Sequence, residues 1–202
     1  LKYFILGAVA SAMFLFGISI IYAAQAYYPT SLTVDMASAL PNISALGFFA
    51  AHTLGYILLI STFAFKLAVF PSHSWVPDVY HGASTPIVSF LASASKLAAL
   101  FGFAKLLLPE NPVIWAYCLS VIGLVSLFLG SLAAIAQQDI KRLLAYSGIV
   151  HMGFVLLGMI FPLDEGAPTP GMLTNSFLYM IIYTIMTVGV FGCLSLLQIE
   201  DA

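Results

Sequence analysis

Two lysines lie within apolar segments that are long enough to cross a lipid bilayer. Lys66 and Lys96 are each surrounded in the sequence by hydrophobic residues. An ammonium group in lipid is costly, so such lysines usually face the protein interior or a water-filled path. Burial disfavours the charged form of an amine, whereas a nearby carboxylate favours it. A lysine whose carboxylate partner comes and goes can therefore load and release a proton.

A structural role is the alternative for both lysines, in which each pairs with a carboxylate and holds helices together. No Asp or Glu lies within the apolar runs 4–26, 43–70, 87–108, 113–136, 143–161 and 172–197. A carboxylate partner would then lie outside this sequence or in another subunit.

His151 is the third candidate, because histidine titrates near neutral pH. It is either a proton-relay group or a neutral histidine bonded to a neighbouring helix, and both interpretations stay open. The other histidines are scattered without HxxxH or HxH spacing, and Cys118 and Cys193 form no CxxC pair. We therefore expect neither a metal site nor a redox cofactor in this chain.

The composition requires a membrane environment. The sequence has 202 residues, of which 62% are hydrophobic and 7% are charged, whereas soluble proteins carry roughly 25% charged residues. Apolar runs of about 20 residues indicate spanning helices, since barrel strands are about 10 residues long. We expect an all-α polytopic membrane protein whose surroundings are the lipid bilayer. With no basic patch, nucleic acid is not an expected partner.

Six transmembrane helices are predicted in a single transmembrane domain. A helix from Ile43 to Tyr80 would be about 57 Å long, against a hydrocarbon core of about 30 Å. Pro71 and Pro77 also remove two backbone donors. We therefore expect an interruption near residues 66–71, of the kind that lines cavities in transporters. The expected helices cover residues 4–26, 43–80, 86–108, 113–136, 143–161 and 172–197.

Basic residues give the expected orientation in the membrane. Lys141 and Arg142 mark their loop as cytoplasmic, and alternation places Lys2 on the same side. Lys105, near the other end of the third segment, is expected to extend toward the membrane surface. The sequence opens on Leu1 almost inside an apolar run, so we expect it to be a piece of a longer chain.

Long motifs resemble the antiporter-like membrane subunits of respiratory complex I, the NADH-quinone oxidoreductase. They are the run 71–86 (PSHSWVPDVYHGASTP) with Lys66 before it and Lys96 after it, the run 138–147 (QDIKRLLAYS), and the run 151–153 (HMG). The lysine at position 96 makes the chain most similar to the N-type subunits, called subunit 2 in mitochondria.

The resemblance implies a fold of fourteen transmembrane helices with two inverted five-helix repeats, of which this chain would be helices six to eleven. Lys66 would be the lysine of the broken seventh helix and Lys96 the central lysine of the eighth. A glutamate on the fifth helix and a lysine on the twelfth would lie outside this sequence.

The implied function is proton translocation by a membrane-arm subunit, through Lys66, Lys96 and His151. It would be coupled to electron transfer from NADH to quinone in other subunits. FMN, iron-sulfur clusters and quinone would be bound elsewhere in the complex, and no cofactor is expected in this chain. The implied partners are other membrane-arm subunits of complex I, and the implied location is the bacterial inner membrane.

Two departures from the family pattern keep alternatives open. Ser72 stands where many members have Phe, and Gly148 where many have Ser. Ser72 also occurs in photosynthetic relatives, so a complex I-like plastoquinone reductase remains an alternative, as does a subunit of a multi-protein cation/proton antiporter. In a purely structural scaffold, Lys66→Met and Lys96→Met would leave pumping untouched.

Overall fold

The computed structural model describes residues 1–27, 44–107, 112–159 and 170–200. Within these ranges the chain is helical almost throughout and contains six stretches long and apolar enough to span a membrane. These findings confirm an all-α, multi-pass membrane fold. The elements are α1 (Lys2–Tyr27), α3 (Ser44–Leu67), the 3-10 turn η1 (Ser72–Ser74), α4 (Trp75–Gly82), α5 (Thr85–Ala92), α6 (Ala94–Leu107), α7 (Pro112–Ile135), α8 (Ile140–Gly158) and α9 (Pro170–Glu200).

The chain forms two compact units that divide between Thr62 and Phe63. In the first unit, a Cβ added at Gly17 would lie 2.9 Å from the carbonyl oxygen of Gly55. The backbones of α1 and α3 therefore approach closely at this pair. The expectation of a single domain stays a prediction, and each unit is described by itself.

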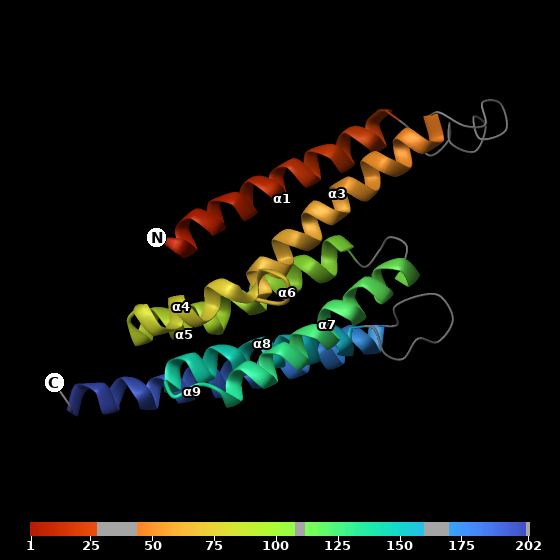
Figure 1. Ribbon diagram of the computed structural model, residues 1–202. Helices are drawn as coiled ribbons and strands as arrows, with labels where there is room; N and C mark the ends of the chain where they lie inside the picture. The colour runs from red at the N-terminus through yellow and green to blue at the C-terminus, as the bar shows by residue number, and fades with distance from the viewer. Residues whose placement is uncertain (28–43, 108–111, 160–169, 201–202) are drawn as a thin grey trace. The chain divides into compact units, whose positions relative to one another are not determined.

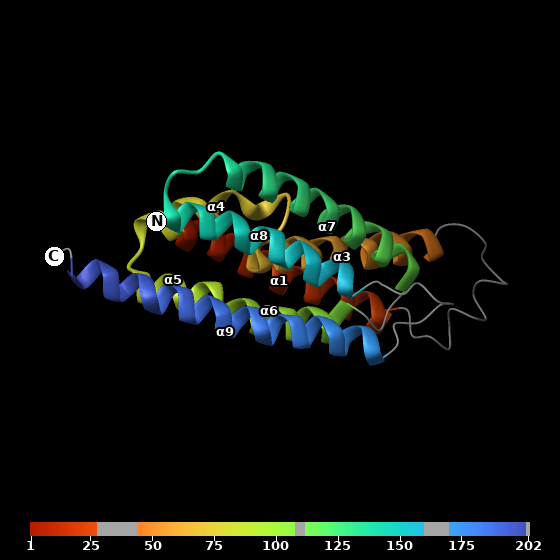
Figure 2. The same ribbon diagram turned by 90° about the horizontal axis from the view of Figure 1, so that it is seen from below.

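In the second unit, α7 packs along α8, while α8 also contacts α4 and α9 (Figures 1 and 2). The two short helices α5 and α6 lie against α9, as Figure 2 shows. Glycines allow the α7–α8 contact, because a Cβ at Gly153 would lie 2.9 Å from the carbonyl oxygen of Gly123. Small residues that let backbones approach are typical of helix packing in membranes.

The interruption expected near residues 66–71 is present. Helix α3 ends at Leu67, and Ala68 has a φ of 63°, a left-handed conformation that residues with a Cβ adopt at a cost. The Phe70–Pro71 peptide bond is cis. From this point the chain turns through η1 into α4.

Side chains from elsewhere in the unit bind the backbone groups that this interruption releases. The indole N–H of Trp75 donates to the carbonyl oxygen of Phe65 at 3.2 Å. The backbone N–H of Phe70 donates to the hydroxyl oxygen of Ser126, on α7, at 2.9 Å. Helix ends leave backbone groups unpaired, and in a membrane protein these groups must find partners within the protein.

A second interruption, at Ser93, separates α5 from α6. Ser93 has φ −109° and ψ −84°, and its hydroxyl donates to the carbonyl oxygen of Ser89 at 2.5 Å. A serine hydroxyl that bonds back to the preceding turn often bends a helix. This break differs from the single helix predicted for residues 86–108, a stretch that has no internal proline to indicate an interruption.

Candidate functional site

Lys96 lies on α6, in the first turn after the interruption at Ser93, and none of its surface is exposed. Its Nζ donates to the carbonyl oxygen of Gly148, on α8, at 3.4 Å. The same Nζ lies 5.7 Å from the centroid of the Tyr183 ring, on α9. A cation over the face of an aromatic ring is attracted by the ring quadrupole. Within the described residues, no carboxylate forms an ion pair with Lys96.

Gly148 leaves the space that Lys96 and Tyr183 occupy. A Cβ at this position would lie 2.9 Å from the hydroxyl oxygen of Tyr183 and 3.2 Å from Nζ of Lys96. Real Cβ atoms essentially never come within 3.0 Å of a neighbouring atom. Any larger residue here must therefore displace the phenol, and the ammonium group must give way by a few tenths of an ångström.

His151 follows Gly148 on the same face of α8, since residues three apart on a helix lie above one another. Its Nδ1 is 2.7 Å from the hydroxyl oxygen of Tyr179. Its ring lies 5.0 Å from the Tyr183 ring, measured between centroids. The Tyr183 side chain also shares a hydrogen bond with Thr187, one turn further along α9.

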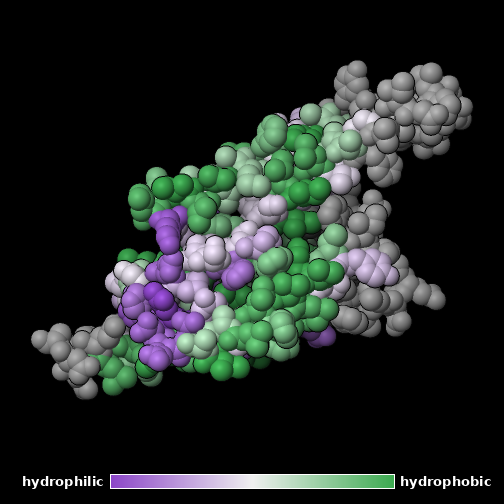
Figure 3. All heavy atoms as spheres, viewed as in Figure 1, coloured by the Kyte–Doolittle hydropathy of each residue, from purple (hydrophilic) through white to green (hydrophobic). Residues whose placement is uncertain are grey.

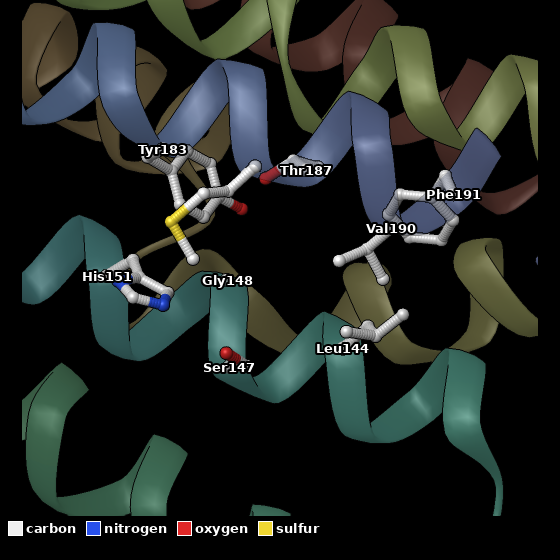
Figure 4. A pocket seen from close by; sticks show the side chains of 9 residues that line it. Leu144, Ser147, Gly148, His151, Tyr183, Thr187, Val190 and Phe191 are labelled. Carbon is white, nitrogen blue, oxygen red and sulfur yellow. The ribbon is translucent and has the colours of Figure 1, made fainter. Parts of the chain in front are cut away.

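A cavity of about 80 Å³ lies between α8 and α9 beside these groups. Figure 4 shows Tyr183 and Thr187 on α9 across this space from His151 and Gly148 on α8. A cavity of this size has room for about two or three water molecules, and Ser147, His151, Tyr183 and Thr187 are the polar side chains in its otherwise apolar lining. The lining residues are Leu144, Ser147, Gly148, His151, Tyr183, Met186, Thr187, Val190 and Phe191.

Of the three residues predicted to handle protons, the structure places Lys96 and His151 around one group of side chains. Lys66 is half-buried near the end of α3, just before the break. In the described part of the chain, no hydrogen bond or ion pair joins Lys66 to Lys96 or His151. The proton-handling roles of all three residues stay predictions.

Hydroxyl groups close to the two lysines in the sequence are hydrogen-bonded to backbone carbonyls. Ser61 donates to the carbonyl oxygen of Ile57 at 2.8 Å, and Thr62 donates to that of Leu58 at 3.0 Å. Ser93 likewise bonds to the preceding turn of its own helix. In the structure these groups satisfy backbone acceptors and are not aimed at an ammonium group.

Tyr179, Tyr183 and Thr187 were not among the site residues predicted from the sequence. They recur every fourth residue, which places them on one face of a helix. That polar stripe within an otherwise apolar segment is the pattern that could have identified them.

A polar cluster marks one end of the second unit. Asp139 lies between His81 and Arg142, with its Oδ2 3.7 Å from His81 Nδ1 and 3.8 Å from Arg142 Nε. Figure 3 shows hydrophilic side chains gathered near the ends of α4 and α8, beside hydrophobic helix surfaces. All three side chains are substantially exposed. Among the residues described, no three His, Cys, Asp or Glu side chains are grouped to hold a metal ion.

Comparisons with known proteins match this architecture. The family described as "NADH:quinone oxidoreductase/Mrp antiporter, TM" matches residues 1–201. The NADH-quinone oxidoreductase subunit N of Parvibaculum lavamentivorans is 38% identical over 204 residues, covering 100% of this chain and 40% of the relative. Subunit N of Laribacter hongkongensis is 39% identical over 198 residues, covering 96% of this chain and 38% of the relative.

Solved structures give the same result. A chain of respiratory complex I from Thermus thermophilus matches with a TM-score of 0.68 and 35% identity, over 96% of this chain and 39% of that chain. A chain of an archaeal membrane-bound sulfane sulfur reductase matches with a TM-score of 0.69 and 24% identity, over 95% of this chain and 38% of that chain. The second likeness concerns the fold alone. The chain spans about two fifths of the length of the curated relatives it matches.

Proposed function

Because this chain belongs to the NADH:quinone oxidoreductase/Mrp antiporter membrane family, we propose that it translocates protons as part of a membrane-arm subunit of an NADH:quinone oxidoreductase. The observation that carries this proposal is the complete burial of Lys96 beside a histidine and a cavity. The similarity of the chain to subunit N relatives supports its assignment to an NADH:quinone oxidoreductase. Lys66, Lys96 and His151 are the residues proposed to move protons.

Lys96 is proposed to load and release a proton as the charge around it changes. Its ammonium form is supported by one carbonyl oxygen and one aromatic face, which replace only part of the hydration that water would supply. A carboxylate approaching from the rest of the protein would favour the charged form, and its withdrawal would favour release. His151 and water in the adjacent cavity are then the next acceptors.

Lys66 is proposed to take part in proton transfer at the interrupted helix. It is only half-buried, and broken helices at membrane depth are found where they line cavities or wet paths. The indole N–H of Trp75 donates to the carbonyl oxygen of Phe65, just before Lys66, and the backbone N–H of Phe70, just after it, donates to Ser126. These bonds support a fixed position for the lysine rather than a frayed helix end.

Electron transfer is assigned in this proposal to other subunits. NADH, FMN, iron-sulfur clusters and quinone would be bound there, and this chain would contribute only to the proton route. Its partners would be the other membrane-arm subunits and the lipid bilayer. The bacterial relatives support the bacterial inner membrane as its location, with the Lys141-Arg142 loop proposed to be cytoplasmic.

The test is quinone-linked proton pumping in membranes that carry Lys66→Ala or Lys96→Ala in the full-length gene. Native gels check that the complex assembles. We expect pumping and turnover to collapse in both variants while assembly is kept. Lys105→Ala is the matched control, because Lys105 is an exposed lysine on α6, and it should pump as the wild type does. If Lys66→Ala and Lys96→Ala both pump at the wild-type rate, the two lysines have structural roles only and the mechanism is refuted.

A subunit of a multi-protein cation/proton antiporter is the second candidate, since the matching family's description includes both groups. In that case the complex purified through this subunit would lack redox subunits. Sodium-driven or potassium-driven proton exchange would then continue without any electron donor. Purification with NADH-oxidising subunits would exclude this candidate, whereas ferredoxin-dependent plastoquinone reduction would indicate the photosynthetic relative.

A further inference from the structure

Lys96 is sealed from the cavity that lies beside it. None of its surface is exposed, and it is absent from the residues that line the cavity between α8 and α9. A proton that moves between Lys96 and His151 must therefore cross an intervening group. Gly148 and Tyr183 both contact Lys96 and line the cavity, but Gly148 offers only a backbone carbonyl, which carries no exchangeable proton.

Tyr183 lies where its hydroxyl could connect Lys96 to the cavity. Its hydroxyl oxygen and Nζ of Lys96 lie 2.9 and 3.2 Å from the same point, the position of a Cβ at Gly148. The two polar atoms can be no farther apart than the sum of these distances, and one water molecule can span such a separation. On its other side, Tyr183 is bonded to Thr187, which lines the cavity.

We propose that the hydroxyl of Tyr183 passes the proton between Lys96 and the cavity lined by His151, an inference that rests on the function proposed above. The Lys96 ammonium gives up a proton through one water molecule to the phenol oxygen. The original phenol proton leaves at the same time to a cavity water, which passes a proton to His151, so that the imidazole ends the step as an imidazolium. One O–H bond forms as another breaks, so the phenol ends the step neutral and Lys96 ends it as an uncharged amine.

The ring and the hydroxyl of Tyr183 have separable roles. The ring face lies under the Lys96 ammonium and contacts the His151 ring, and phenylalanine would keep both contacts. Only the hydroxyl can give and receive a proton. Tyr183→Phe therefore removes the proposed step while preserving the packing of this largely buried side chain.

The experiment compares Tyr183→Phe with Tyr117→Phe in the full-length subunit within the assembled complex. Tyr117 is a matched control because its side chain is 68% exposed on α7. We expect Tyr183→Phe to lower quinone-linked proton pumping by about ten-fold or more, a loss typical of removing a proton-transfer group. Tyr117→Phe should pump as the wild type does. Wild-type pumping by an assembled Tyr183→Phe complex would overturn the proposal.

Lys96→Ala, measured in the same series, separates this inference from the proposed function. If Lys96→Ala stops pumping while Tyr183→Phe pumps normally, the relay is refuted and the proposed function stands. If Lys96→Ala also pumps normally, both fail.

If the Tyr183→Phe complex does not assemble, a variant with a more acidic phenol provides a second test of the proposal. Incorporating 3-fluorotyrosine at position 183 retains the shape of the side chain but makes its hydroxyl more acidic. Under the proposal, the rate of proton pumping then changes, because proton transfer through the phenol depends on the acidity of its hydroxyl. A purely structural ring would leave the rate unchanged, and an unchanged rate would overturn the proposal.

Discussion

Replacing Lys96 by methionine should stabilise the protein while stopping its proposed activity. The side chain is fully buried, and its Nζ has one long hydrogen bond and one aromatic face as partners. Burying an ion costs several kcal/mol even after the protein relaxes. The hydrogen bond returns about 1.5 kcal/mol and the cation–π contact about 1 kcal/mol. Methionine fills a similar volume without a charge, so we expect the free energy of unfolding to rise by about 2 kcal/mol.

The assay is denaturant unfolding of the full-length subunit in detergent, together with pumping by the assembled complex. Leu100→Met is the matched control, because Leu100 is equally buried and lies one turn further along α6. Exchanging leucine for methionine conserves volume and usually costs less than about 1.5 kcal/mol. This control should therefore be slightly less stable than the wild type and should pump normally.

The sign of the stability change tests the reasoning. If Lys96→Met lowers the free energy of unfolding by about 3 kcal/mol or more, the lysine is held by a buried carboxylate. Removing one partner of such a pair leaves the other charge buried and uncompensated. The balance worked out here, which counts only Gly148 and Tyr183 as partners, would then be wrong.

Two further substitutions test how the helices are held. Ser126→Ala leaves the N–H of Phe70 without its acceptor and should lower the free energy of unfolding by about 1–3 kcal/mol. Denaturant unfolding measures this loss against the control Ser120→Ala, because the Ser120 hydroxyl bonds only within α7. Gly153→Val places a side chain 2.9 Å from the carbonyl oxygen of Gly123 and should cost about 1–3 kcal/mol through overpacking. Gly189→Val, with nothing within 4 Å, should be near neutral, and an equal loss in both valine variants would contradict this account of the α7–α8 contact.

Much of the fold could be predicted from the sequence because the bilayer imposes simple constraints. Apolar length predicted the spanning helices, and the two prolines after Lys66 predicted the interruption of the second one. The break at Ser93 could not be predicted in this way. A serine is common in membrane helices, and whether its hydroxyl bends the chain depends on the packing around it.

The candidate site was predictable in part for a similar reason. A lysine in an apolar run is conspicuous because its charge conflicts with its surroundings, and Lys96 is indeed fully buried. Tyr183 was not conspicuous, because tyrosine is ordinary in such segments. Its importance depends on the position of Gly148 on another helix, and sequence spacing along one segment carries no information about that distance.

The absence of a side chain at Gly148 constrains two positions of the chain at once. The phenol of Tyr183 and the amine of Lys96 fill the volume that a Cβ at position 148 would need, so residues 148 and 183 share one space. A serine at position 148 would therefore require the phenol of Tyr183 to move, or a smaller residue at position 183. The residue at one of these positions thus limits which residues fit at the other, although the two lie on different helices.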